Sequence, residues 1–156
     1  MDVIVGGTFG YLHSGHKALL KKAFEIGDFV CIGLTTDRYV KMNKNADIPV
    51  YTERKRILED FARRQGKGFE IVPIDDGFGP SITGRFDAVV VSEGTIKGAL
   101  EINRIRKERR LEELEIIKIG YVMADDSIPI STSRIIRKEI TAEGRLIARK
   151  RRQSMA

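Results

Sequence analysis

Apolar and polar positions along this chain fall into two alternating patterns. In the first, short apolar runs are nearly continuous, which is typical of strands buried on both faces of a sheet. In the second, apolar residues return every three or four positions, which is typical of amphipathic helices. The strand-like runs cover residues 2–7, 28–36, 69–75, 87–93 and 114–122.

The helix-like segments lie between these runs and have recognisable ends. We expect helices at residues 14–27, 52–66 and 95–111 and a last one within 124–144, with a short helix or loop at 37–45 and a loop at 75–86. Thr52 and Thr95 stand at expected N-caps, because a hydroxyl accepts a hydrogen bond from a free amide of the first turn. Gly27 and Gly66 stand where the helical spacing ends.

This alternation of strands and helices predicts an α/β protein with helices on both faces of a parallel sheet. Five such strands indicate a doubly wound, Rossmann-like sheet in a single domain over residues 1–144. Ligands in such folds bind beyond the carboxyl ends of the strands, where the direction of winding reverses. The loops after the first, fourth and fifth strands should therefore converge on one site.

The composition changes this expectation little. A hydrophobic content of 42% and a charged content of 32% describe a soluble, globular chain. No apolar run approaches the length of a membrane span, and the start lacks the basic and apolar regions of a signal peptide. Cys31, the only cysteine, sits in an apolar run and is expected in the core, which suits a reducing cytoplasm.

The net charge of +6 is partly local. Residues 145–156, expected as a helical extension or a disordered tail, contain no acid and five basic residues: Arg145, Arg149, Lys150, Arg151 and Arg152. Such a tail can bind nucleic acid, but it is more often a solvated end. The chain has no recognised nucleic-acid motif and no aromatic residues among these charges, which disfavours nucleic acid as a partner.

Both histidines of the chain, His13 and His16, lie at the first strand-to-helix junction, after a glycine pair and Thr8. A helix N-terminus presents free amides and a partial positive charge, which attract phosphate and disfavour imidazolium. We therefore expect neutral histidines that donate to phosphate, with Gly15 leaving room for a ligand to reach the backbone. Two histidines without a nearby third ligand make a poor zinc site.

A second group of polar residues stands near the other end of the chain. Ser131, Thr132 and Ser133 precede a basic segment with Arg134 and Arg137. Hydroxyls and amides at a helix start could wrap a triphosphate, with Arg134 neutralising charge. The alternative is an ordinary Ser/Thr cap on a basic helix.

Together, "HSGH" and "ISTSR" resemble the two motifs of the nucleotidyltransferase superfamily, H-x-G-H and I-S-S-T-x-x-R. Thr132 and Ser133 are exchanged relative to the common order. Related sequences often carry an arginine at the position of Ile136, whereas here Arg137 follows it.

Within that superfamily the chain is similar to the phosphopantetheine adenylyltransferase family of archaeal and eukaryotic type. The similar segments are "VGGTFGYLHSGHKALL", "GLTTDRYVK", "YTERKRILEDF" and "VVVSEGTIKGALEINRIRKERRLEELEI". "VSEGTIKGALEIN" is the segment that points to this branch. The bacterial form has an arginine-containing loop where this chain has Ser92 and Glu93.

The resemblance implies that ATP and 4′-phosphopantetheine react to give dephospho-coenzyme A and pyrophosphate, a step of coenzyme A biosynthesis. The attacking phosphate oxygen is already ionised at pH 7, because the second pKa of a phosphate monoester is about 6. Such a reaction needs no general base, and positioning and charge stabilisation supply the catalysis. Mg²⁺ is expected with ATP, held by phosphates and water rather than by residues of the chain. Asp125 and Asp126 are expected in a turn.

The resemblance also implies roles for individual residues. His16 donates to the α-phosphate, Lys41 bridges that phosphate and the attacking one, and Arg134 stabilises the triphosphate; Lys44 is the alternative to Lys41. The predicted ATP-binding residues are Gly7, Thr8, Phe9, His13, Gly15, His16, Ser131, Thr132, Ser133 and Arg134. The predicted acceptor-binding residues are Thr8, Lys41, Ser92, Glu93 and Asn103, while Arg106 either lines the site or forms charge pairs on a solvated helix.

Three other functions stay open at this stage. The two motifs alone do not distinguish phosphopantetheine from nicotinamide mononucleotide, flavin mononucleotide, or glycerol 3-phosphate with CTP as the donor. A basic nucleic-acid-binding module and a nucleotide-binding regulator without turnover are the alternatives from other classes. The sequence does not indicate an oligomeric state.

Overall fold

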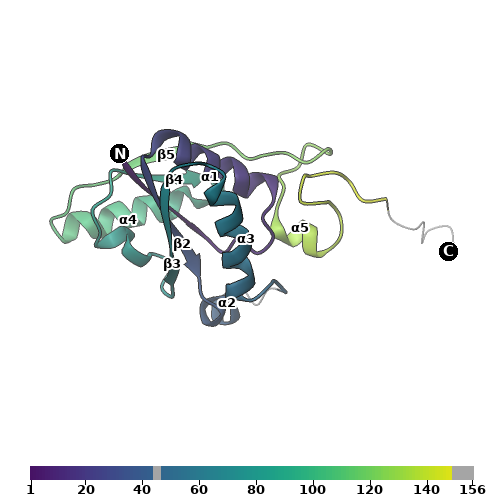
Figure 1. Ribbon diagram of the computed structural model, residues 1–156, viewed down its shortest axis with the longest axis horizontal. Helices are drawn as coiled ribbons and strands as arrows, with labels where there is room; N and C mark the ends of the chain where they lie inside the picture. The colour runs from purple at the N-terminus through teal and green to yellow at the C-terminus, as the bar shows by residue number, and fades with distance from the viewer. Residues whose placement is uncertain (44–46, 149–156) are drawn as a thin grey trace.

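The computed structural model describes residues 1–43 and 47–148 (Figure 1). Five parallel strands form one sheet in the order β3-β2-β1-β4-β5, with helices on both faces, so the prediction of a doubly wound five-stranded sheet is confirmed. The expectations for Lys44, Arg149, Lys150, Arg151 and Arg152 concern residues outside the described part.

The elements follow the predicted order. The strands are β1 (Asp2–Gly7), β2 (Phe29–Thr35), β3 (Gly68–Ile74), β4 (Ala88–Ser92) and β5 (Glu115–Ile119). The helices are α1 (Ser14–Ile26), α2 (Asp37–Asn43), α3 (Tyr51–Arg63), α4 (Ile96–Glu108) and α5 (Thr132–Ile136), with short 3-10 helices η1 (Gly79–Ile82) and η2 (Glu93–Thr95). None of the helices in the described residues is long and apolar enough to cross a membrane.

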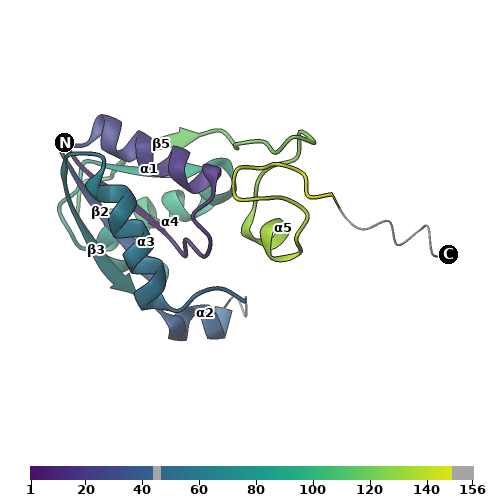
Figure 2. The same cartoon turned by 45° about the vertical axis from the view of Figure 1, so that its right-hand side comes forward.

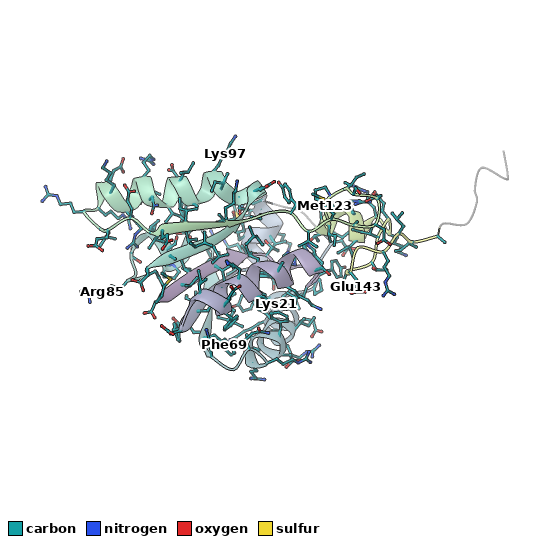
Figure 3. The ribbon with its side chains drawn as sticks, turned by 90° about the horizontal axis from the view of Figure 1, so that it is seen from above. Lys21, Phe69, Arg85, Lys97, Met123 and Glu143 are labelled. Atoms are coloured by element: carbon teal, nitrogen blue, oxygen red, sulfur yellow. The ribbon has the colours of Figure 1, made fainter. Side chains whose placement is uncertain are left out.

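Alternate residues of the central strands point into two separate cores. Val3 and Val5 of β1 pack with buried residues of α1 and α3 on one face of the sheet. Ile4, between them, packs with Cys31 and with α4 on the other face. Figure 3 shows α1 and α4 on opposite sides of the strands. The continuous apolar character of the strands follows from this burial on both faces.

The start of α3 differs from the prediction. Its N-cap is Val50, not Thr52, and no side chain of the cap position accepts a hydrogen bond. Instead, the amide of Tyr51 donates to Asp37 Oδ1 of α2 at 2.8 Å. The Asp37 carboxylate of α2 therefore takes the capping role that the sequence predicts for Thr52. Thr95 is the N-cap of α4 as predicted, although its side chain does not cap that helix.

The last predicted helix is much shorter than expected. α5 ends at Ile136, and Lys138 beyond it adopts a left-handed φ of 59°, which closes the helix. The rest of residues 120–148 forms loops joined by two isolated bridges, Met123 with Pro129 and Ile140 with Leu146. In the described part of the tail, residues 145–148 are not helical. Figures 1 and 2 show this segment standing beside the sheet rather than over a face.

Two polar residues of α4 that were candidates for the site have structural contacts instead. Asn103 donates to the carbonyl of Leu114 at 2.9 Å and accepts from its amide at 2.7 Å, which fixes the approach to β5. Arg106 is 3% exposed, so it is not on a solvated helix face. Its guanidinium donates to the carbonyls of Glu112, Ser81 and Gly84 at 2.7, 2.9 and 2.8 Å, and it ties η1 to the end of α4.

Replacing Arg106 tests this role. In Arg106→Met, three carbonyls lose a charged donor, and each buried group left without a partner costs about 1–3 kcal/mol. We expect the free energy of unfolding, measured by urea denaturation, to fall by about 3 kcal/mol. The matched control is Arg104→Met on the same helix, because the pairs of Arg104 with Glu101 and Glu108 are exposed and screened by solvent. Equal losses in the two variants would contradict the proposed role of Arg106.

Candidate active site

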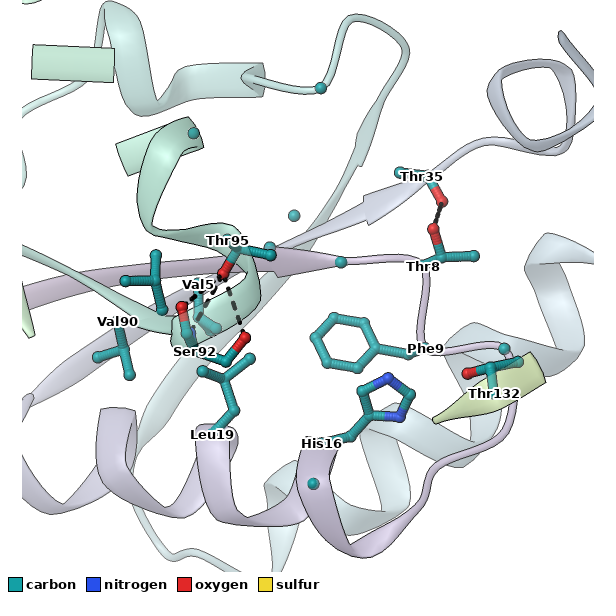
Figure 4. A pocket seen from close by; sticks show the side chains of 18 of the residues that line it. Val5, Thr8, Phe9, His16, Leu19, Thr35, Val90, Ser92, Thr95 and Thr132 are labelled. Carbon is teal, nitrogen blue, oxygen red and sulfur yellow. Dashed lines mark hydrogen bonds between the residues drawn. The ribbon is translucent and has the colours of Figure 1, made fainter. Parts of the chain in front are cut away.

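A cavity of about 700 Å³ opens at the carboxyl ends of the strands (Figure 4). The cavity is lined by the loop after β1, by Ser92 and Thr95 at and after the end of β4, and by the segments 120–122 and 130–133 after β5. The predicted convergence of these three loops is therefore confirmed. Residues near the ends of β2 and β3 complete the wall, among them Thr35, Tyr39, Ile74 and Phe78.

The loop after β1 turns sharply at Phe9. Phe9 has a left-handed φ of 48°, which is rare for a bulky residue, and its side chain is 3% exposed. The Thr35 hydroxyl donates to Thr8 Oγ1 at 3.0 Å, which leaves the Thr8 proton available to a ligand. Among the described residues, the amides of Thr8, Phe9 and Gly10 have no hydrogen-bond acceptor. Consecutive free amides of this kind form a concave site for an anion.

The histidine pair caps α1. His13 is the N-cap, and its Nδ1 accepts from the amide of His16 at 3.2 Å. The two rings stack with 3.6 Å between centroids and 14° between planes. A Cβ on Gly15 would lie 2.9 Å from His13 Cε1. The glycine between the histidines thus makes room for the His13 ring, and it also lines the cavity.

Hydrogen bonds give the two histidines opposite tautomers. His13 Nδ1 accepts a proton, so neutral His13 carries its own proton on Nε2. His16 Nδ1 lies 2.9 Å from the carbonyl oxygen of Tyr11 and 3.4 Å from the amide of His13. The shorter contact, to a carbonyl oxygen that carries no proton, favours the tautomer with Nδ1–H, which leaves Nε2 of neutral His16 bare. His13 therefore offers a donor at Nε2, and His16 offers a lone pair.

Both rings are neutral at pH 7. Burial lowers the pKa of His13 to about 4. Burial, together with the neighbouring His13, lowers the pKa of His16 to about 3. The expectation of neutral histidines agrees with these values, although for His16 the tautomer is not the one that donates through Nε2.

The second group of hydroxyls stands at the start of α5. Ser131 is the N-cap of α5 and accepts from the amide of Arg134 at 3.3 Å. Ser131, Thr132 and Ser133 all line the cavity, and Figure 4 shows Thr132 on the side of His16 and Phe9. The amide of Ser14 donates to the carbonyl of Ala142 at 2.9 Å, which joins this segment to the start of α1.

Arg134 does not line the cavity. Its guanidinium pairs with Asp126 and, at 3.2 Å, with Glu139, and it donates to the carbonyl of Ile128 at 3.3 Å. Asp126 also accepts from the amide of Ile128 at 3.1 Å, so it is both the expected turn residue and the partner of a buried arginine. The Arg134 side chain lowers the pKa of the Asp126 carboxyl.

The cavity thus brings together most, but not all, of the predicted residues. Those that line it are Gly7, Thr8, Phe9, His13, Gly15, His16, Ser92, Ser131, Thr132 and Ser133. Lys41, Glu93, Asn103 and Arg134 do not line it. Lys41 is exposed on α2 and Glu93 is exposed on η2, whereas Asn103 and Arg134 are buried against other partners.

Sequence reasoning missed several lining residues. Thr35 and Tyr121 each stand at or just after the end of a strand-like run, and that position was the available signal. Thr95 was interpreted only as a helix cap. Within residues 1–43 and 47–148, no group of three or more His, Cys, Asp or Glu side chains is placed to hold a metal ion.

Comparison with known proteins identifies the family. The sequence profile of the cytidylyltransferase-like family matches residues 4–138. The chain is 42% identical over 149 residues to a phosphopantetheine adenylyltransferase from Methanosarcina barkeri, and the match covers 92% of this chain and 91% of that one. It is 47% identical over 146 residues to a bifunctional phosphopantetheine adenylyltransferase/NTP phosphatase from Thermoplasma volcanium, covering 93% of this chain but only 44% of the relative.

A solved structure agrees with the fold. A protein of unknown function from Archaeoglobus fulgidus superposes with a TM-score of 0.70 at 34% sequence identity, over 76% of this chain and 89% of that one. The matched profile spans the cavity loops from the end of β1 to α5, and the Methanosarcina relative matches over nearly its whole length. The chain therefore belongs to the cytidylyltransferase-like family and, within it, to the phosphopantetheine adenylyltransferases.

Proposed function

We propose that this protein transfers the adenylyl group of ATP to 4′-phosphopantetheine, forming dephospho-coenzyme A and pyrophosphate. The observation that carries the proposal is one cavity that holds three free amides, two stacked histidines and three hydroxyls at the switch point of the sheet. These are groups for binding several phosphates, and the described residues of the cavity include no nucleophile paired to a base. The names of the relatives supply the acceptor.

The loop after β1 is proposed to hold the attacking phosphate of the acceptor. Its ligands are the amides of Phe9 and Gly10 and the hydroxyl of Thr8. Ser92 lines the cavity on the β4 side, where it would contact the rest of the acceptor. Lys41 extends from α2, whose Tyr39 lines the same cavity, and we propose that it bridges the attacking phosphate and the α-phosphate.

The histidine pair and residues 131–133 are proposed to hold ATP. His13, with Nε2–H, donates to the β- or γ-phosphate, and the hydroxyls of residues 131–133 bind the triphosphate tail. Arg134 would have to leave two carboxylates to reach a phosphate, so we propose that it holds the loop that carries these hydroxyls. ATP is expected to enter as its Mg²⁺ complex, with phosphate oxygens and water as ligands, because no described carboxylate cluster is placed to hold the ion.

We expect the reaction to take place in the cytoplasm. Cys31 is completely buried, and burial raises the pKa of its thiol to about 11. A thiol of this kind needs no oxidising compartment and is suited to a reducing one.

The first prediction concerns the acceptor. Pyrophosphate release should be measured with ATP and Mg²⁺ and with 4′-phosphopantetheine, nicotinamide mononucleotide, flavin mononucleotide or glycerol 3-phosphate, plus CTP for the last. We expect turnover with 4′-phosphopantetheine alone. Turnover with another acceptor would support nucleotidyl transfer but contradict 4′-phosphopantetheine as the acceptor. Absence of turnover with all of them would favour the non-catalytic alternatives.

The second prediction concerns His16. His16→Ala removes a group that we place at the α-phosphate, where charge develops, so kcat should fall by about 10²–10³-fold. Nucleotide binding, measured by calorimetry, should persist, because the other phosphate contacts remain. Lys21→Ala is the control, since Lys21 is exposed on the same helix. A protein that only binds nucleotide would show no difference in turnover between the two variants.

The third prediction concerns pH. Neutral His16 presents a bare Nε2, so a hydrogen bond from this atom to the α-phosphate requires the ring to gain a proton. The bound phosphates would raise the pKa of His16 from about 3, and linkage then makes ATP binding tighter as the pH falls from 8 toward 6. Calorimetry at pH 7 in buffers of different ionisation enthalpy should show proton uptake that His16→Gln abolishes. Equal uptake in both proteins would assign the proton to ATP itself.

A further inference from the structure

Arg54 of α3 carries a guanidinium that has no exposed surface, although its helix otherwise presents charged residues to solvent. Nε donates to the carbonyl of Pro49 at 2.8 Å, and Nη2 donates to Asp37 Oδ1 at 3.0 Å. Nη1 donates to two carbonyls, those of Thr8 at 3.0 Å and Thr35 at 2.8 Å. The single carboxylate partner is itself half exposed.

These contacts place Arg54 behind the wall of the cavity. Thr8 and Thr35 follow Gly7 and Leu34, the last pair of the β1–β2 ladder, and Thr35 ends β2. Both threonines line the cavity, and their hydroxyls are joined by a hydrogen bond, drawn in Figure 4. One nitrogen atom of Arg54 therefore fixes the separation of the two strand ends on the side away from the ligand.

The contact to Thr8 also sets the direction of the next amide. A trans peptide is planar, and its N–H points opposite to its carbonyl. Because the carbonyl of Thr8 points to Arg54, the amide of Phe9 points away from Arg54. This amide has no acceptor among the described residues, and the left-handed φ of Phe9 is an unfavourable conformation that other contacts must hold.

We propose that Arg54 is a positioning residue that aims the Phe9 amide at the attacking phosphate of the acceptor. The inference rests on the proposed function for the identity of that phosphate. Arg54 does not line the cavity, so it acts on a ligand through the backbone that it holds, that of Thr8 above all. A purely structural role would hold α3 against the sheet and would affect both substrates alike.

Steady-state kinetics of Arg54→Gln and Arg54→Lys separate these two roles. For Arg54→Gln we expect kcat/KM for 4′-phosphopantetheine to fall by about 100-fold, while the Kd for ATP stays within about 2-fold of the wild-type value. The kcat/KM of Arg54→Lys should lie between those of the wild-type protein and Arg54→Gln, because a lysine is a point charge that cannot reach all four acceptors. A fall of less than about 3-fold in Arg54→Gln, or an equal weakening of both substrates, would overturn the inference.

Leu58→Ala is the matched control. Leu58 lies one turn further along α3, is completely buried and does not line the cavity. The variant should melt at a lower temperature than the wild-type protein but keep both kinetic constants when assayed well below its melting transition. If Leu58→Ala reproduces the kinetic changes of Arg54→Gln, loss of stability explains them and the inference fails.

A measurement without turnover keeps the test separate from the proposed function. The backbone amide resonance of Phe9 should shift when inorganic phosphate is titrated into ¹⁵N-labelled wild-type protein, and this shift should be lost in Arg54→Gln. A wild-type resonance that does not respond would overturn the inference even if the enzyme uses 4′-phosphopantetheine. If the Phe9 resonance shifts in the wild-type protein and not in Arg54→Gln, but no acceptor is turned over, the inference is supported and the proposed function is contradicted. If neither Arg54 variant folds, the wild-type titration decides.

Discussion

The parallel pairing of β1 with β2 on one side and with β4 on the other is the constraint from which the site follows. Because β1 is central, α1 leaves its carboxyl end over one face of the sheet and α4 leaves β4 over the other. The two connections diverge, and a crevice opens between them at the carboxyl ends. The cavity, the histidine pair at the start of α1, and Ser92 at the end of β4 all lie at this point.

Buried arginines make the loops around this crevice rigid. Beyond the ends of the strands the carbonyls have no ladder partners, and a carbonyl buried without a donor is costly. Arg54 supplies donors to the ends of β1 and β2, and Arg106 supplies them to the segment around η1. Arg134 does the same in the loops before α5, where it also pairs with two carboxylates. Each of these three arginines thus donates to several backbone carbonyls, and the same arrangement occurs at three places in the molecule.

The histidine pair shows how packing sets protonation. Burial lowers the pKa of both rings, and their stacking adds repulsion against a second charge. The N-cap hydrogen bond and the Tyr11 carbonyl then assign different tautomers to two residues that look equivalent in the sequence. This asymmetry arises from backbone geometry within a single turn of helix.

The five strands, most of the helices and the placing of both histidines at the first strand-to-helix junction can be predicted from the sequence alone. Apolar runs and helical spacing show which residues are buried, and both patterns can be read from neighbouring positions. "HSGH" places its two histidines within one helical turn. Only the tertiary structure decided the partners of single polar residues. The sequence predicts Thr52 as a cap, but Asp37 caps α3, and it predicts Asn103 as a site residue, but Leu114 engages it. Arg54, which the sequence does not single out, reaches Thr8 across 46 positions. The sequence pattern around a polar residue on a helix is the same whether its side chain contacts water or a distant carbonyl. Only the fold brings that carbonyl within hydrogen-bond distance.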